Sequence, residues 1–193
     1  MPITLGTHIF SLPFCTTEEA AQITRALGMD IMDLGNGRDL EPTAVAQSVG
    51  ATADRVNAIA ERTGVRFHDA FPQPTGKHIT NTPDEQEYRH QREVDAAWIA
   101  FGAQIGLTGI TLSPGMNWPG LPVDRAYARS RDQLRPLVDV AGEHGLTLRI
   151  EPHVESCVWS PDLALRMLDD VPGLSLTIDH SHFAFHGFTY DET

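Results

Sequence analysis

Apolar and polar residues alternate with a period of two in several short segments, and longer segments of helical periodicity separate them. In LTLRIE, Leu148 and Ile150 share one face, whereas Arg149 and Glu151 share the other. The same alternation recurs in LSLTID and in ITLS. Because successive side chains of a strand point to opposite faces, each segment predicts a strand with one apolar and one polar face.

The whole chain reads as an alternation of strands and helices. Strands are predicted over 2–10, 29–35, 65–71, 107–115, 146–153 and 174–179. Helices are predicted over 16–28, 51–64, 82–106, 123–145 and 160–173. Thr16 and Glu19 form a capping box at the first helix start, and Gly28 and Gly64 are stop signals. Six strands that alternate with helices predict a parallel α/β fold.

The polar strand faces decide between two kinds of parallel sheet. An open doubly wound sheet is covered by helices on both faces, so its strands tend to be apolar throughout. One polar face instead favours a (β/α) TIM-type barrel, in which that face lines the interior. Such a barrel has eight strands, and this chain supplies about six βα units. We therefore expect a single domain over 1–193 that is truncated at its C-terminal side.

The ending HGFTYDET resembles a loop that leads into a further helix. A fragment of a longer protein is the preferred explanation, and closure of the barrel by another chain is the alternative. Open sheet edges would favour association, so a homo-oligomer is possible.

Charge and cysteine content indicate which partners and which cellular compartment to expect. The formal net charge of −12 argues against a nucleic-acid partner, because phosphate backbones are bound by clustered Lys and Arg. Cys15 and Cys157 are far apart, which indicates no disulfide framework and favours the cytoplasm. The N-terminus does not resemble a signal peptide, and no apolar run is long enough to cross a bilayer, so no membrane association is expected.

Candidate chemistry gathers where the predicted strands end, which is where barrel active sites form. These residues are His8, His68, Asp69, Glu151, His153, Asp179 and His182. Glu151 and Asp179 share the inward phase of neighbouring strands, and two such carboxylates repel each other unless a cation lies between them. One divalent metal ion is therefore predicted, with Mn²⁺, Mg²⁺ or Co²⁺ favoured by oxygen ligands and Zn²⁺ possible.

The segment LRIEPHVES, followed by PDLALRMLDDVPGLSLTIDHSHF, resembles the xylose-isomerase-like barrel superfamily of sugar isomerases and epimerases. In that family one metal is bound by a Glu on strand five, an Asp on strand six, a His on strand seven and an acid on strand eight. Glu151 and Asp179 match the first two, and the other two have no counterpart in this chain. His182 matches a His that contacts substrate oxygens in the sugar epimerases.

The resemblance implies a metal-dependent isomerase or epimerase, or a related dehydratase, acting on a sugar, keto-sugar or cyclitol. The metal would polarise the carbonyl while a carboxylate removes the neighbouring proton. Glu151 is then both ligand and base, and His182 is catalytic or contacts the substrate. Further substrate contacts are expected from His8, His68, His153 and Trp118. The 193-residue chain alone is expected to be inactive, because part of the site is missing.

Two other functions remain open. A truncated barrel could act as a non-catalytic binding module. A phosphodiesterase related to endonuclease IV would need a basic groove and extra His ligands, but the second strand ends in DLGNGRD without a His.

For some of these residues a purely structural role is the alternative explanation. Glu151 could simply pair with Arg149, and His180 is expected to be structural. The remaining histidines are expected at the surface: His78, His90, His144 and His186.

Overall fold

The computed structural model describes residues 3–73 and 79–193. Its sheet consists of six strands: β1 (Thr7–His8), β2 (Ile31–Gly35), β3 (Arg66–Phe71), β4 (Gly109–Leu112), β5 (Thr147–Ile150) and β6 (Ser175–Leu176). All neighbouring strands pair in parallel, and their order in space is their order in the chain. Each lies inside a predicted segment, so the parallel α/β prediction is confirmed.

Helices connect the strands. They are α1 (Thr17–Ala26), α2 (Pro42–Gln47), α3 (Val49–Thr63), α4 (Glu85–Gln104), α5 (Val123–Glu143), α6 (Pro161–Asp170) and α7 (His180–Phe185), with 3-10 turns η1 (Ile9–Ser11), η2 (Ile79–Asn81) and η3 (Tyr190–Glu192). The short α2 and α7 were not predicted. The predicted first strand is reduced to two residues, because His8 caps the turn η1 by accepting a hydrogen bond from the Phe10 N–H.

The helix boundaries follow local signals. Thr16 Oγ1 accepts from the Glu19 N–H, and the Glu19 carboxylate accepts from the Thr16 N–H, which confirms the capping box at the start of α1. Gly28 and Gly64 follow the ends of α1 and α3 with φ of 81° and 71°. Glycine tolerates this left-handed conformation, so both helices stop where the sequence indicated.

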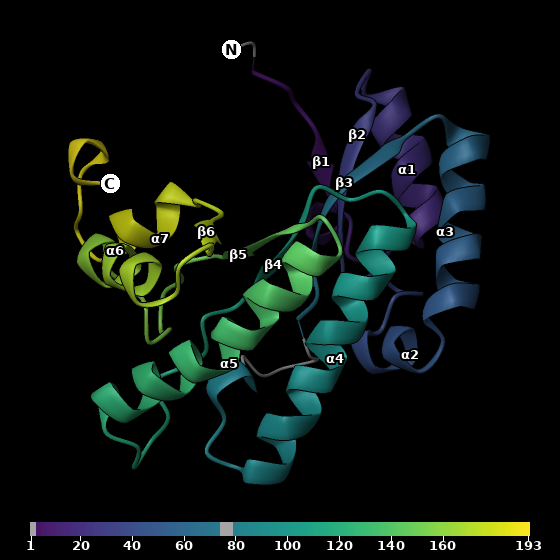
Figure 1. Cartoon of the computed structure of the whole chain (residues 1–193). Coiled ribbons are helices and arrows are strands. Elements are labelled where there is room, and N and C mark those ends of the chain that lie inside the picture. Colours follow the sequence, from purple (N-terminus) through teal and green to yellow (C-terminus); the bar gives the residue numbers. More distant parts are fainter. Residues whose placement is uncertain (1–2, 74–78) are drawn as a thin grey trace.

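The two faces of the sheet differ as the sequence predicted. Leu148, Ile150 and Leu112 are buried beneath the helical layer, in which α3, α4 and α5 lie side by side (Figure 1). The other face lines a cavity to which both β1 and the segment after β6 contribute, through His8 and Asp179. A sheet whose first and last strands border one cavity must be curved, as in an incomplete (β/α) barrel.

Two details differ from the expected pattern. Ile178, placed on the apolar face by the alternation, is 51% exposed, because regular pairing in β6 ends at Leu176. Between β2 and β3 the register shifts, so that His68 and Asp69 together oppose Asp33. Such a bulge turns two consecutive side chains toward one face, and both line the cavity.

Across the described residues, the helices include none with the length and apolar character needed to cross a membrane.

Candidate metal centre

Three potential metal ligands converge at the carboxyl ends of β5 and β6. Glu151 directly follows β5, Asp179 follows β6, and His182 lies in α7. His182 Nε2 is 4.0 Å from Glu151 Oε1 and 3.7 Å from Asp179 Oδ2. One ligand atom from each residue lies within 4.8 Å of the other two. The structure therefore brings together the two residues expected to bind metal and the histidine expected beside them.

The short helix α7 produces this convergence. Asp179 is its N-cap residue, and Asp179 Oδ1 accepts a hydrogen bond of 2.9 Å from the Ser181 N–H. Residues three apart lie on the same side of a helix, so His182 returns to the side of Asp179. Thr177 N–H donates to the Ile150 carbonyl at 2.9 Å, which holds the start of this segment against β5.

The local electrostatics favour a cation. Burial, reinforced by the nearby Asp179 charge, raises the pKa of Glu151 to about 7. The hydrogen bonds from Ser181 lower the pKa of Asp179, so that carboxyl stays ionised near neutral pH. Burial, followed by the neighbouring His153, lowers the pKa of His182, which favours the neutral imidazole. Metal binding requires a neutral imidazole and ionised carboxylates, so His182 and Asp179 already favour the binding forms, whereas Glu151 must release its proton.

The three side chains fit a divalent ion. Two carboxylates and one imidazole form a donor set suited to Mn²⁺, Mg²⁺ or Co²⁺, and Zn²⁺ also accepts these ligands. Glu151 and His182 have side chains only 14% and 17% exposed, whereas Asp179 is 46% exposed. A cation here would oppose both causes of the raised pKa of Glu151, the burial of its carboxyl group first and the Asp179 charge second.

A second polar cluster lies deeper in the cavity. Arg149 Nη1 is 2.5 Å from Asp69 Oδ2, and the Thr111 hydroxyl donates to Asp69 Oδ1 at 3.2 Å. Thr177 Oγ1 lies 2.7 Å from Thr111 Oγ1, and extends the chain of hydrogen bonds to the end of β6. Burial raises the pKa of Asp69, while Arg149 opposes this shift. Asp69, and not Glu151, is thus the partner of Arg149.

Gly109 makes room for the Arg149 side chain. A Cβ atom on Gly109 would collide with Arg149 Nη1, so the guanidinium occupies the space that a side chain on β4 would fill. The bulge in β3 places Asp69 at the level of Gly109, where the two strands pair. The absence of a side chain at Gly109 on β4 and the extra residue of the bulge in β3 together allow this ion pair to form.

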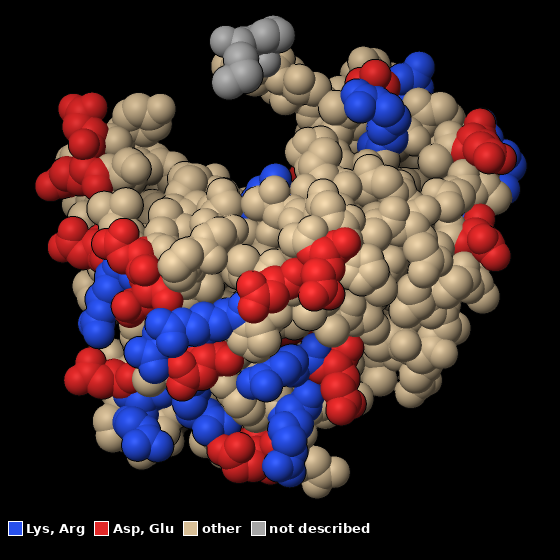
Figure 2. Space-filling model, in the orientation of Figure 1, with Lys and Arg blue, Asp and Glu red and all other residues tan. Residues whose placement is uncertain are grey.

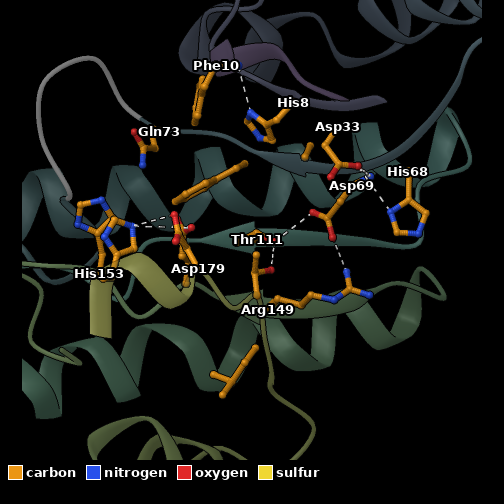
Figure 3. A pocket seen from close by; sticks show the side chains of 16 residues that line it. His8, Phe10, Asp33, His68, Asp69, Gln73, Thr111, Arg149, His153 and Asp179 are labelled. Atoms are coloured by element: carbon orange, nitrogen blue, oxygen red, sulfur yellow. Dashed lines mark hydrogen bonds and ion pairs between the residues drawn. The ribbon is translucent and has the colours of Figure 1, made fainter. Parts of the chain in front are cut away.

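The cavity joins both clusters. It has a volume of about 660 Å³, and its lining includes Phe10, Phe71 and Gln73 besides the polar residues. In Figure 3, His153 and Asp179 lie at one end and His68 lies at the other, with Asp69 and Arg149 nearer His68.

The residues predicted to contact substrate occupy different parts of the cavity, and one of them lies outside it. His8, His68 and His153 line the cavity, together with His182. The centroids of the His153 and His182 rings are 3.8 Å apart, so His153 lies beside His182 at the mouth of the cavity. His68 lies in the middle of β3 and not at its end, with Nδ1 3.6 Å from Asp33 Oδ1. It can contact only a ligand that reaches the end of the cavity opposite His153 and Asp179 (Figure 3).

Trp118, which was expected to contact substrate, does not line the cavity. Its indole N–H donates to Asn81 Oδ1 at 2.8 Å. Asn81 also accepts from the Met116 N–H and donates to the Met116 and Ala126 carbonyls. This buried amide fixes the loop between β4 and α5 and turns the indole away from the cavity.

Of the other histidines, those that the structure describes lie outside the cavity. His180 Nδ1 is 2.8 Å from Thr193 Oγ1, and the ring packs edge-on against Tyr190. His90, His144 and His186 are exposed, as expected. His78 lies outside the described residues.

Several lining residues were not proposed from the sequence as site residues. They include Phe10, Asp33, Phe71, Gln73, Thr111, Arg149 and Thr177, whereas Asp69 was already a candidate from its place at the end of a predicted strand. The inward phase of the strands was a usable signal for three of them: Thr111, Arg149 and Thr177 lie on the polar strand faces.

Comparisons with known proteins agree with this architecture. A family model described as the xylose isomerase-like TIM barrel matches residues 19–192. A search of curated proteins by sequence found no match. A D-psicose 3-epimerase structure in the presence of D-fructose aligns with TM-score 0.78 and 15% identity, over 97% of this chain and 68% of that one.

Two other solved structures show the same fold. The 3-keto-D-glucoside 4-epimerase YcjR from E. coli aligns with TM-score 0.70 and 18% identity, over 91% of this chain and 67% of that one. The IolI protein with a bound zinc atom aligns with TM-score 0.72 and 15% identity, over 97% of this chain and 67% of that one. With its model matched over most of its length and its strands in barrel order, the chain belongs to the xylose isomerase-like TIM barrel family.

Proposed function

We propose that this chain carries the strand-five and strand-six part of a divalent-metal site in a sugar isomerase or epimerase. The observation that carries the proposal is the convergence of Glu151, Asp179 and His182 at the carboxyl end of the sheet. A dehydratase acting on a related cyclic ketone is included, because its reaction begins with the same proton abstraction. Glu151 and Asp179 would hold the metal.

The chain's own residues account for the proton transfer. A bound divalent ion would polarise the carbonyl of the substrate as a Lewis acid. Glu151 is the proposed base, because its carboxylate lies at the proposed metal site beside His182 and faces the cavity. His182 lies within reach of the same space and would hydrogen-bond a substrate oxygen. His153, whose ring lies against His182, would border the substrate.

The relatives support the choice of substrate class. D-psicose 3-epimerase was solved with D-fructose, and YcjR is a 3-keto-D-glucoside 4-epimerase. The zinc atom in the IolI structure supports a metal site. Identity below 20% supports a fold and a reaction type, and leaves the individual sugar open.

The charge distribution supports a small molecule over nucleic acid. Acidic and basic side chains are interspersed over the α4 and α5 face in Figure 2, and this face has no large basic area. The cavity is lined by four carboxylates, on Asp33, Asp69, Glu151 and Asp179. Phosphodiester backbones are bound through Lys and Arg, so an endonuclease-like function has little support here.

Paramagnetic relaxation by Mn²⁺ tests metal and substrate binding together. Mn²⁺ is added to the chain, and the relaxation rates of D-fructose protons are measured by NMR. A sugar held beside Mn²⁺ is expected to relax faster than the same sugar with Mn²⁺ alone. Glu151→Gln is expected to abolish the enhancement, because it removes a ligand charge. The test needs no turnover, which the 193-residue chain is expected to lack.

Thr189→Ala serves as a matched control, because Thr189 caps the exposed turn η3 away from the cavity. Wild-type enhancement should persist in this variant. Mn²⁺ binding that is unaffected by Glu151→Gln would contradict the metal role. Mn²⁺ binding without any effect on a panel of keto-sugars would favour the non-catalytic binding module.

A further inference from the structure

Arg149 is the only Lys or Arg among the described residues that line the cavity. A guanidinium in a cavity is ordinarily the best available group for binding a phosphate or carboxylate, because its planar N–H fork matches two oxygens. A free Arg149 would therefore predict an anionic substrate, such as a sugar phosphate.

The structure shows that Arg149 is not free. Its Nη1 lies 2.5 Å from Asp69 Oδ2, and the side chains of Arg149 and Asp69 are only 21% and 12% exposed. The guanidinium lies over Gly109, in space that a side chain there would fill. Arg149 is thus directed toward the deep end of the cavity and engaged by a carboxylate.

Asp69 is itself held in place. Its Oδ1 accepts from the Thr111 hydroxyl, and its backbone N–H donates to Asp33 Oδ1 at 3.0 Å. Thr111 is in turn 2.7 Å from Thr177. The Asp69 side chain therefore cannot turn away from Arg149 without breaking the hydrogen bond from Thr111 on β4.

Within residues 3–73 and 79–193, the other Asp and Glu side chains that line the cavity carry no basic counterpart besides Arg149. Asp33, Glu151 and Asp179 add carboxylates beyond the one that Arg149 neutralises. One divalent ion would offset two of the carboxylate charges and would leave no excess positive charge for a phosphate.

We propose that Asp69 is a specificity-determining residue: by engaging Arg149 it makes the cavity select uncharged polyol-carbonyl substrates and exclude phosphorylated or carboxylated ones. This inference rests on the proposed sugar-binding function of the site and names its substrate class. Asp69 acts through Arg149 and does not itself contact the reacting atoms.

The experiment measures binding of inorganic phosphate by isothermal titration calorimetry, with a chelator present so that metal plays no part. The wild-type chain is compared with Asp69→Asn, which keeps the side-chain shape and removes the charge. Asp69→Asn is expected to bind phosphate at least about 10-fold more tightly than wild type, because Arg149 gains a free charge. The double variant Asp69→Asn, Arg149→Met should lose this gain, which separates the cavity from surface arginines.

A second measurement uses only wild-type protein, so that it remains informative if Asp69→Asn does not fold. D-fructose and D-fructose 6-phosphate are compared as ligands of the Mn²⁺-loaded chain. The uncharged sugar is expected to bind more tightly by about 10-fold or more. Tighter binding of the phosphorylated sugar would overturn the proposal, and so would an Asp69→Asn variant with unchanged phosphate affinity.

The two proposals can fail separately. If the chain binds no Mn²⁺ but Asp69→Asn gains phosphate affinity, the metal-site proposal fails and the role of Asp69 stands. If Mn²⁺ and D-fructose bind as proposed but phosphate affinity is unchanged by Asp69→Asn, the inference about specificity fails alone.

Discussion

Arg149 and Asp69 are 80 residues apart in the sequence, yet Arg149 Nη1 lies 2.5 Å from Asp69 Oδ2 inside the curved sheet. Arg149 precedes Glu151 by two residues on the same strand face, and Thr177 likewise precedes Asp179. Arg149 contacts Asp69 directly, and Thr177 reaches it through Thr111. The Asp69 carboxylate on β3 thus holds Arg149 directly and Thr177 through Thr111. Each of these two residues lies two positions before a proposed metal-binding acid.

Gly109→Ala tests how strongly this arrangement supports the fold. The added methyl group would collide with the Thr147 carbonyl oxygen and displace the Arg149 guanidinium, which would leave Asp69 buried without its partner. Overpacking of a well-filled interior typically costs about 1–3 kcal/mol, and the broken ion pair adds to that cost. We expect the free energy of unfolding to fall by about 2–4 kcal/mol, measured by urea denaturation.

Gly142→Ala is the matched control. Gly142 lies in α5, and a Cβ atom there would meet nothing within 4 Å. Alanine favours a helix over glycine by about 0.5–1 kcal/mol, so this variant should be as stable as wild type or more stable. Equal effects of the two substitutions would show that the guanidinium does not depend on the space at Gly109.

His182 and His180 form a natural pair for testing the metal site. His182 Nε2 lies 3.7 Å from Asp179 Oδ2, whereas His180 packs against Tyr190 outside the cavity. His182→Asn should weaken Mn²⁺ binding about 10-fold or more, because residues that ligate or orient a metal contribute at least that much. His180→Asn should leave the dissociation constant unchanged. Calorimetric titration of both variants decides the matter, and equal losses would contradict the assignment of His182.

Mn²⁺ binding is expected to strengthen as the pH rises from about 5 to about 8. Glu151 must lose its proton to bind a cation, and its pKa is raised to about 7 in the metal-free protein. Below that pH a proton competes with the metal, so one proton is released on binding. In Glu151→Gln the residual affinity should vary less with pH over this range. A wild-type affinity that is flat across pH 7 would show that Glu151 does not bind the ion.

The strand faces and helix ends could be predicted because they depend on neighbours in the sequence. Leu148 and Ile150 alternate with Arg149 and Glu151, and the structure keeps that alternation. Thr16 needs only a residue three positions away to form its capping box. These interactions are local, so the one-dimensional pattern contains them.

The pairing of Asp69 with Arg149 could not be predicted, because it depends on register between strands. Asp69 enters the cavity beside His68 only through the bulge opposite Asp33, which breaks the period of two. Trp118 was misplaced for a related reason: Asn81, 37 residues earlier, captures its indole N–H. Both outcomes depend on contacts between distant segments, and side-chain type alone does not encode them.

Asp95 in α4 is a buried acid outside the cavity. Its side chain is almost fully buried: the residue is 1% exposed, and Gln91 Nε2 donates to Oδ1 at 2.7 Å. Oδ2 has no hydrogen-bond partner within the described part of the chain. Burial raises the pKa of Asp95 to about 7, against 3.8 for an exposed aspartate. The native state therefore retains a proton that the unfolded chain releases.

Asp95→Asn should therefore stabilise the chain in a pH-dependent way. Because the folded pKa is raised, the native state of wild type loses stability as the pH rises from about 4 to about 7. Replacement by an uncharged amide should raise the free energy of unfolding by about 1–3 kcal/mol at about pH 8, and by much less at about pH 4. Denaturation at both pH values measures the difference. Asp54→Asn, at an exposed position of α3, should change neither value. A gain for Asp95→Asn that is equal at both pH values would indicate that the ionisation of Asp95 is not its cause.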